Sequence, residues 1–454
     1  MWLYKLISKT IKIDIFDLNY AYSSEESGTL YIKDHNMPRF GVIVRVLSFI
    51  KGFVFSLFSI NFDCFFKLKE KKLLFFVSTS NQYESIKKIH INNSNSEVLG
   101  TFGFGNIKFP ILLSYLSSLF FLPKLIIHYS TSKNYKRKSF KYSFDQYWLS
   151  YGLYFISRIG FKYLKPNIVV FSNDHSFENR SVLRAAIDEN ITTIFIQHAS
   201  VTKTLKFPKL IYNYAFLEGL DSLQKYDSYG KSKTKVFLVG QSKADDFIQF
   251  RNKSNEIKNL GICVSSLDII EKVEEVCLEI IKKFPKLKLK LRPHPSDKRF
   301  NGWKQLSKKL EINFSDAKNE SSFKFLQMVD SIITGDSNIV LESVVMNVYP
   351  IRYVFADKMT DFYGFIHSGI VMNAYNNPND LLDRLDELIN YKPNIQYKSK
   401  AYNDVVGTKY EGKSTLIIVE LINNIIITEN IIYKKKWIRM KGIKNLEAYH
   451  LIGN

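Results

Sequence analysis

Cysteine is scarce in this sequence of 454 residues. The three cysteines, Cys64, Cys263 and Cys277, form no CxxC pair and have no metal-ligand spacing. An odd and sparse set excludes a disulfide framework and a cysteine-based zinc site, and it is typical of proteins in a reducing compartment. We therefore expect a cytoplasmic protein.

The signature motifs of several enzyme classes are also missing. The sequence has no GxGxxG after its first predicted strand, no GxxxxGK[ST], no HExxH and no GxSxG. These absences disfavour dinucleotide oxidoreductases, P-loop NTPases, zincins and α/β-hydrolases. The 27 Tyr and 36 Phe follow no RNP-like, helix-turn-helix or finger pattern. Nucleic acid is therefore not the partner we expect.

No long uninterrupted apolar run is present either, and the N-terminus shows no secretory signal. Residues 40–66 and 111–128 come nearest to membrane character, but Arg45 and Lys51 interrupt the first and Pro123 and Lys124 the second. Neither offers about 20 consecutive apolar residues. They predict either buried core helices or a basic, apolar surface that lies peripherally on the inner face of the plasma membrane.

Acidic residues are outnumbered, 43 against 64 basic ones, which gives a formal net charge of +21. The basic residues cluster at 133–141, 282–292 and 434–441. Such an excess favours an anionic partner, namely nucleic acid, an anionic membrane surface or a phosphorylated substrate. A solvated basic surface without a partner is the alternative, so charge alone identifies no ligand.

Short apolar runs alternate with helical patterns from residue 72 onward. In the first half we predict strands at 73–81, 167–175, 192–200 and 235–242, with a helix at 178–190. In the second half we predict strands at 260–266, 286–295, 310–316, 331–336 and 348–354, separated by helices. This alternation predicts an α/β protein with two Rossmann-like, doubly wound domains that face a cleft. We place an N-terminal α/β domain with apolar, basic N-terminal helices at 1–250, a C-terminal α/β domain at 251–427 and a basic tail at 428–454.

Polar residues stand where four of these strands end, and ligands of parallel sheets bind at the carboxyl ends of the strands. They are Asp174 and His175, then Gln197, His198 and Ser200, then Arg292 and His294, and finally Asp336, Ser337 and Asn338. The combination is more specific than any one of them.

The stretch RPHP fixes His294 between two prolines. Each proline forces the preceding residue toward extended geometry, so the imidazole leaves the strand with little backbone freedom. A histidine can donate a hydrogen bond to a phosphate or act as an acid near neutral pH, and Arg292 can add a charge-assisted contact to the same anion. The alternative is a histidine that only caps a turn. Upstream, Lys286, Lys288 and Lys290 do not suit a central parallel strand, so the strand lies near an edge or its lysines reach solvent along their stems.

The stretch GDSNIVLES (335–343) predicts a turn at Gly335 and a helix that begins near Ser337 and Asn338. Free backbone amides and two polar side chains at a helix start can bind a phosphate, although simple N-capping explains the same residues. Glu342, within the helix, can accept hydrogen bonds from a ribose.

In the first domain, His198 at a strand end can take a proton from an acceptor hydroxyl or contact a departing phosphate. Asp174, at a neighbouring strand end, competes for the role of base. The sequence leaves this choice open.

These motifs together resemble a known group. QHAS (197–200), RPHP (292–295), GDSNIVLESVVMNVYPI (335–351) and YEGKS (410–414) resemble GT-B glycosyltransferases of bacterial surface polysaccharides. The patterns are similar to those of CDP-glycerol glycerophosphotransferases of teichoic acid synthesis and of HP-motif Kdo and sialic acid transferases of capsule synthesis. The resemblance covers residues 165–425.

By this resemblance, His294 matches the HP histidine, Ser337 with Asn338 matches a serine pair, and His198 matches the histidine of a WHG motif. QHAS replaces WHG, Asn338 replaces a second serine, and LEGLD (217–221) is the nearest counterpart of an acidic D/E-D/E-G triplet.

The resemblance implies a metal-independent transferase without a resident cofactor. It would move a glycosyl or polyol-phosphate group from a CMP-, CDP- or UDP-linked donor to a lipid-linked or polysaccharide acceptor. Arg292, His294, Ser337 and Asn338 would neutralise the leaving phosphate, and Glu342 would hold the nucleotide. Two rivals remain. One is a UDP-sugar 2-epimerase-like enzyme, and the other is a non-catalytic basic protein that binds glycan or nucleic acid.

Overall fold

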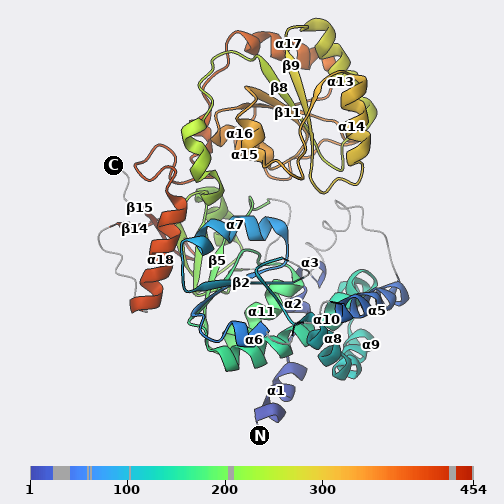
Figure 1. Ribbon diagram of the computed structural model, residues 1–454, viewed down its shortest axis with the longest axis vertical. Helices are drawn as coiled ribbons and strands as arrows, with labels where there is room; N and C mark the ends of the chain where they lie inside the picture. Colours follow the sequence, from blue (N-terminus) through green and yellow to red (C-terminus); the bar gives the residue numbers. More distant parts are fainter. Residues whose placement is uncertain are drawn as a thin grey trace.

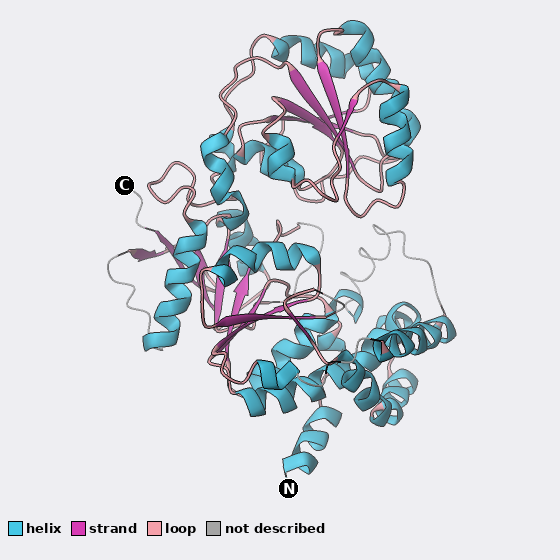
Figure 2. Ribbon diagram, in the orientation of Figure 1, coloured by secondary structure: helices cyan, strands magenta, loops and turns pink. Residues whose placement is uncertain are grey.

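The protein folds into two α/β domains, one above the other in Figure 1. This computed structural model describes residues 2–23, 41–58, 61, 64–101, 104–202, 209–428 and 436–451. In each domain a central sheet lies between helices, shown in magenta and cyan in Figure 2. The predicted fold class, α/β with two Rossmann-like domains, is confirmed.

The first domain is built on a sheet of nine strands in the order β14-β15-β7-β6-β5-β4-β1-β2-β3. All neighbours are parallel except the antiparallel pair β14 and β15. The strands are β1 Leu73–Val77, β2 Ser96–Gly100, β3 Ile107–Lys108, β4 Ile168–Phe171, β5 Thr192–Ile196, β6 Tyr214–Leu217, β7 Lys235–Leu238, β14 Trp437–Arg439 and β15 Glu447–Leu451.

Both faces of this sheet are buried, which explains the near-continuous apolar strands. In β1, Leu74 and Phe76 join one apolar cluster, whereas Leu73, Phe75 and Val77 join another on the opposite face. Helices α10 (Asn134–Leu164) and α11 (Phe177–Asp188) cover the first face, and α7 (Ser80–Ile91) and α18 (Ser414–Thr428) cover the second. Helix α12 (Leu220–Ser228) follows β6.

A helical region packs on α10 beside the sheet. It contains α1 Trp2–Ile11, α2 Ile15–Leu18, α3 Tyr20–Ser23, α5 Val42–Leu57, α6 Cys64–Lys67, α8 Ile111–Phe120 and α9 Leu122–Thr131. Phe49 of α5 is buried in a stack on Trp148 of α10, with ring centroids 3.7 Å apart. Among the described residues, no single helix is long and apolar enough to cross a membrane; α8 and α9 meet that test only together, with a 63° bend between them.

The second domain has a six-stranded parallel sheet in the order β10-β9-β8-β11-β12-β13. Its strands are β8 Asn259–Val264, β9 Lys288–Pro293, β10 Asn313–Phe314, β11 Ser331–Thr334, β12 Tyr349–Tyr353 and β13 Ala374–Tyr375. Its helices are α13 Ile270–Lys283, α14 Phe300–Lys309, α15 Ser322–Leu326, α16 Ile339–Val345 and α17 Pro378–Ile389.

The lysines of β9 are explained by its place in the sheet. β9 is second from the edge, and its outer neighbour β10 spans only two residues. Lys288 is exposed, whereas Lys290 extends over the Phe325 ring at 6.0 Å. The strand therefore lies near an edge, and its lysine stems cover apolar surface.

The C-terminal part of the chain differs from the predicted division into domains. Residues 414–427 fall within the predicted range of the second domain, but the sequence also indicates a last helix there that can pack back across the domains; this helix, α18, packs its apolar residues on the first sheet. The described part of the predicted tail, 436–451, forms β14 and β15, and β15 pairs with β7. The physical reason is burial, because α18 covers apolar side chains of β1 and β4 that would otherwise face water.

The chain therefore crosses between the domains twice. The first crossing runs through the 3-10 helix η1 (Ser242–Phe250), and the second follows η2 (Gln396–Ser399). Asp245 of the first crossing accepts hydrogen bonds from the backbone N–H groups of Ser414 (3.1 Å) and Thr415 (2.6 Å), which cap α18. Arg251 also pairs with Glu411 at 2.6 Å. These contacts fix the two interdomain segments to each other.

Candidate active site

Each sheet has one point where the strand order reverses, and such a point is where ligands of open α/β sheets bind. In the first domain it lies between β1 and β4, and in the second between β8 and β11. Asp174 and His175 follow β4, and Gly335 to Asn338 follow β11. Residues chosen from the sequence therefore stand at both reversal points.

Asp174 and His175 form a hydrogen-bonded pair at the end of β4. His175 Nδ1 lies 3.0 Å from Asp174 Oδ1, and the Tyr226 hydroxyl donates to Asp174 Oδ2 at 2.6 Å. Burial alone would raise the pKa of Asp174, but the bonds from His175 and Tyr226 outweigh it and lower that pKa. An ionised Asp174 keeps the proton of His175 on Nδ1, so Nε2 is the nitrogen that can accept a proton.

His198, at the end of β5, is held as a neutral imidazole. Its pKa is lowered to about 3, mainly by burial and also by the nearby Lys243 and His175, while Asp174 and a hydrogen bond to the Ser172 backbone act in the opposite direction. Lys243, in η1, donates to the His198 carbonyl at 2.7 Å. His198 and Asp174 are therefore brought together, as predicted neighbours, with Lys243 beside them.

Two buried carboxyl groups interact across the domains around the same lysine. The pKa of Glu218, directly after β6, is raised to about 8, mainly by burial; Lys243 acts to lower it and Glu342 of α16 acts to raise it. Burial likewise raises the pKa of Glu342, and Lys243 and Arg292 lower it. Lys243 thus lies within the electrostatic reach of groups from both domains.

Glu178, in the first turn of α11, adds another titratable carboxyl next to His175. Its pKa is raised to about 7 because the effect of burial outweighs the lowering by a hydrogen bond from Ser176 and by the charge of His175. A group with this pKa can exchange protons near neutral pH.

His294 is exposed where β9 ends, with its backbone N–H bonded to the Val264 carbonyl at 2.8 Å. The backbone N–H of Ser296 donates to His294 Nδ1 at 3.3 Å, so the neutral ring carries its proton on Nε2. Partial burial and the charge of Arg292 lower the pKa of His294. The ring therefore offers Nε2–H as a hydrogen-bond donor, the opposite polarity to His175.

Arg292 is buried and committed to its own domain. Its guanidinium donates to Ser315 Oγ at 2.7 Å, to Glu320 Oε2 at 3.3 Å and to the Glu320 carbonyl at 2.8 Å. It also stacks over the Phe325 ring at 5.1 Å. The structure thus places Arg292 beneath the strand end, apart from the exposed His294.

Ser337 and Asn338 stand before α16, as predicted, with their side chains half-buried. Asn338 makes no side-chain cap, and its Oδ1 is buried without a hydrogen-bond partner among the described residues. An unpaired acceptor calls for a donor, such as a sugar hydroxyl or a base amino group. Asp336, by contrast, is occupied by Thr360 Oγ1 at 2.7 Å and the Phe362 N–H at 2.6 Å.

Gly335 lies close to the Asp268 side chain. A Cβ at this position would lie 2.7 Å from Asp268 Oδ1, which belongs to the loop after β8. The Ser265 N–H donates to Asp268 Oδ2 at 2.6 Å. A larger residue at 335 would therefore make the Asp268 carboxylate shift.

Sequence reasoning missed Lys243 and gave Glu218 only a minor role. The signal for Glu218 was present, because LEG ends a strand as QHA does one strand earlier. Lys243 gave no signal, since it belongs to an irregular polar segment between the domains. Neither Glu218–Glu342 coupling nor the Lys243 contact follows from any local pattern.

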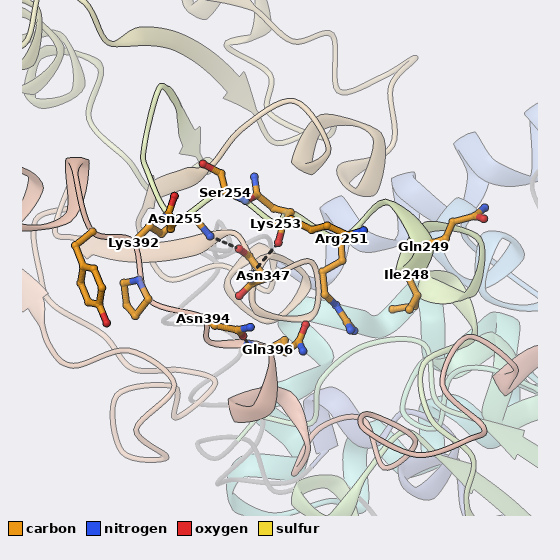
Figure 3. Close-up of a pocket in the computed structure, with 13 residues that line it drawn as sticks. Ile248, Gln249, Arg251, Lys253, Ser254, Asn255, Asn347, Lys392, Asn394 and Gln396 are labelled. Carbon is orange, nitrogen blue, oxygen red and sulfur yellow. Dashed lines mark hydrogen bonds between the residues drawn. The ribbon is translucent and has the colours of Figure 1, made fainter.

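A polar cavity of about 560 Å³ lies elsewhere, beside the first crossing and at the amino ends of the second-domain strands. Figure 3 shows Arg251, Asn255, Asn347 and Lys392 on its walls. Asn347 Nδ2 donates to the Asn252 carbonyl and Lys392 Nζ to the Asn347 carbonyl, so these side chains bond to one another. Across the described ranges, no group of three or more His, Cys, Asp and Glu side chains is placed to hold a metal ion.

Comparison with known proteins identifies the fold. No protein-family model and no curated protein sequence matches the chain. Among solved structures, UDP-GlcNAc 2-epimerase from Neisseria meningitidis, bound to UDP-GlcNAc, is similar with a TM-score of 0.52 and 14% identity, over 78% of this chain and 100% of that one. The wall teichoic acid polymerase TagF (TM-score 0.47, 14% identity, 84% and 96% covered) and Acinetobacter baumannii MurG (0.44, 11%, 78% and 99%) are also found. At these identities the likeness concerns the fold, and the chain has the two-domain α/β architecture of the epimerase.

Proposed function

We propose that this protein is a transferase that moves a glycosyl or polyol-phosphate group from a nucleotide-activated donor to a growing bacterial surface polysaccharide. The second domain would bind the donor, CMP-, CDP- or UDP-linked, and the first would bind a lipid-linked or polysaccharide acceptor. The reaction would take place at the cytoplasmic face of the membrane, without a resident metal or cofactor.

One observation carries this proposal. The first domain presents a histidine paired with a buried carboxylate, His175 with Asp174, and the second presents an exposed histidine whose Nδ1 accepts a hydrogen bond from the Ser296 N–H, His294. Transfer to a hydroxyl needs both functions: a base for the acceptor proton and a donor for the charge that develops on the leaving phosphate.

On the donor side, we assign His294 and Lys243 to the leaving phosphate. Asn338 would bind a hydroxyl or amino group of the nucleotide through Oδ1, and Ser337 would contact the phosphate beside it. Glu342, in the same helix, would accept hydrogen bonds from the ribose. Arg292 would act from behind, by holding the strand end that carries His294.

On the acceptor side, we assign the base to the Asp174–His175 pair. Asp174 orients the imidazole and stabilises its protonated form, as a buried carboxylate does in other carboxylate–histidine pairs. His198 has too low a pKa to hold a proton near neutrality, so we assign it to hydrogen bonding with a ligand.

The first test is a thermal-shift panel with CMP, CDP, UDP and GDP on the wild type and His294→Ala. A nucleotide at 100 times its Kd stabilises a folded protein by about 2.7 kcal/mol, so its binding is measurable without knowledge of the acceptor. We expect CDP or UDP to raise the melting temperature of the wild type and to have a smaller effect on His294→Ala. If no nucleotide stabilises the wild type, the transferase proposal fails.

A second candidate function has one observation in its favour. Glu218 and Glu342 are carboxyls with raised pKa on elements of different domains, and an epimerase needs proton exchange at opposite faces of a sugar carbon. Incubation of UDP-sugars with the enzyme alone distinguishes the two. Conversion of a nucleotide sugar without an acceptor would establish the epimerase and exclude our first proposal.

A further inference from the structure

We propose that α5, α8, α9 and residues 133–141 form a surface that docks on an anionic lipid bilayer. We call it the basic apolar platform. This proposal rests on the proposed function in one respect: it names the residues by which the transferase would associate with the membrane. The evidence for the surface itself is the exposure and charge of these residues, which do not depend on the reaction.

Helix α5 is apolar on two faces, and only one of them is buried. Phe49 packs inward on Trp148 and Tyr115. On the outer face, Ile43, Leu47, Ile50 and Val54 follow one another at helical spacing, and all are exposed. Phe58, at the end of the helix, is 85% exposed. A stripe of this length toward water is unusual unless something covers it.

The bent pair α8 and α9 continues the same apolar surface. Helices α5 and α8 are in contact, and both pack on α10 (Figure 1). Phe120, at the bend, is 83% exposed. The other exposed apolar side chains of this pair are Leu116, Leu119, Ile126 and Ile127.

The charge of the platform has one sign. Across residues 42–57 and 111–164 the sequence has ten basic residues and a single acidic one, Asp145. Asp145 is already paired with Arg45 at 3.5 Å. The cations that remain exposed beside the apolar surface include Lys51, Lys133, Lys136, Arg137, Lys138 and Lys141.

A cavity of about 620 Å³ opens among these cations at the junction of α9 and α10. Arg137, Lys138 and Lys141 line it together with Tyr129, Asn134 and Tyr135. The Arg137 guanidinium lies 5.6 Å from the Tyr129 ring centroid. Three cations around a polar cavity suit the phosphate of a lipid headgroup.

The combination of apolar and cationic side chains indicates which partner binds the platform. A second copy of the chain would bring the exposed cations of one platform against those of the other, and nucleic acid would use the cations but leave the apolar stripe in water. An anionic bilayer matches both, because apolar burial at the headgroup boundary adds to attraction by anionic lipid. Since no single described helix can span a membrane, the platform would lie on its surface.

The test is co-sedimentation with vesicles of phosphatidylcholine, with and without phosphatidylglycerol. Two variants probe the two components: Lys138→Glu/Lys141→Glu for charge and Phe58→Ser/Phe120→Ser for the apolar contact. Lys282→Glu/Lys286→Glu is the matched control, because it makes the same change in net charge on exposed lysines of the second domain. All four positions of the probing variants are exposed, so unchanged thermal unfolding confirms that they fold.

We expect the wild type and the control to bind phosphatidylglycerol vesicles at least 10-fold more tightly than neutral ones, and both probing variants to lose at least 10-fold in affinity. Equal loss in the control, or no binding by the wild type, would overturn the proposal. Two further results would overturn it. One is a wild-type dimer that Phe58→Ser/Phe120→Ser dissociates without loss of vesicle binding, which would make the surface a dimer interface. The other is tight RNA binding that only Lys138→Glu/Lys141→Glu abolishes, which would make it a nucleic-acid site.

The nucleotide thermal shift separates this proposal from the proposed function. The platform variants should keep the shift, because they lie outside the donor side. A protein that binds vesicles but no nucleotide would retain the platform and lose the transferase.

Discussion

The two domains differ in the charged and titratable residues near the carboxyl ends of their parallel strands. In the second domain, arginines in or after the strands are neutralised internally: Arg292 by Glu320, Arg299 by Asp297 and Arg352 by Asp336. In the first domain the strand ends carry buried groups whose pKa values are displaced, above all His198 and Glu218.

This difference separates residues that hold the structure from residues that can take part in a reaction. A paired charge keeps one protonation state and fixes geometry, whereas a buried group with a displaced pKa stores free energy that a ligand or a proton can release. The paired arginines of the second domain therefore fix geometry, whereas His198 and Glu218 of the first domain are groups that can change state. The predictions below test this division.

The largest effect should come from the base. We predict that His175→Ala lowers the rate of transfer to the acceptor by about 10²- to 10⁴-fold, the usual contribution of general base catalysis. Binding of the donor nucleotide, measured by thermal shift, should stay unchanged. His90→Ala is the matched control, because His90 lies in the last turn of α7, at the other end of that helix from the site. Equal losses in both variants would remove His175 from the mechanism.

Arg292→Ala should act on stability. Its loss leaves Glu320 and Ser315 without their guanidinium partner, so we expect the free energy of unfolding to fall by about 3 kcal/mol in urea denaturation. His294→Ala, two residues further on and exposed, should change it by less than about 0.5 kcal/mol. If the two variants are equally stable, Arg292 is available for ligand, as the sequence alone predicted.

Glu218→Gln should change the pH dependence of stability. Because the pKa of Glu218 is raised to about 8 in the folded protein, the folded state holds a proton that the unfolded state releases near pH 4.5. Stability of the wild type therefore falls as pH rises from about 5 to about 8 and then levels off. The variant should lack this decline and gain on the order of 3 kcal/mol over the wild type at pH 8. Parallel pH profiles would contradict the assignment.

Asp297→Asn should show the opposite sign in the second domain. Burial alone would raise the pKa of Asp297, but hydrogen bonds from Arg299 and Trp303 outweigh it and lower that pKa. Its stabilisation is present above the normal range of an aspartate and is lost as pH falls through the folded pKa. We expect the variant to lose about 1 kcal/mol at pH 7 and to be less sensitive to acid. Acid titration of denaturation midpoints measures both.

Much of this architecture could be predicted because parallel strands are local, strongly apolar signals. β1, β4, β5, β9 and β11 fall within the ranges predicted from sequence, and β8 begins one residue before its predicted range. The carboxyl ends of β4, β5, β9 and β11 carry the residues that the pattern selected. The positions of Asp174, His198 and His294 at strand ends required only this local information.

Helix α10 escaped prediction for a physical reason. It is enclosed by α5, α8, α9 and α11, so its second half, from Tyr147 to Leu164, is buried on most sides and shows no single apolar stripe. Its first turns are basic and resemble a solvated segment. Contacts between distant parts of the chain were not predicted either. β15 pairs with β7 across some two hundred residues, and the interaction of Glu218 with Glu342 depends on how the two domains meet.

The double crossing has a consequence for the order in which the protein can be completed. The face of the first sheet that contains Phe75 and Val77 stays uncovered by α18 until the whole second domain has been synthesised. Folding of the first domain on the ribosome therefore ends last, although its sequence begins first. A chain that stops before residue 414 would expose this apolar face. We therefore expect incomplete translation products to aggregate or to be degraded.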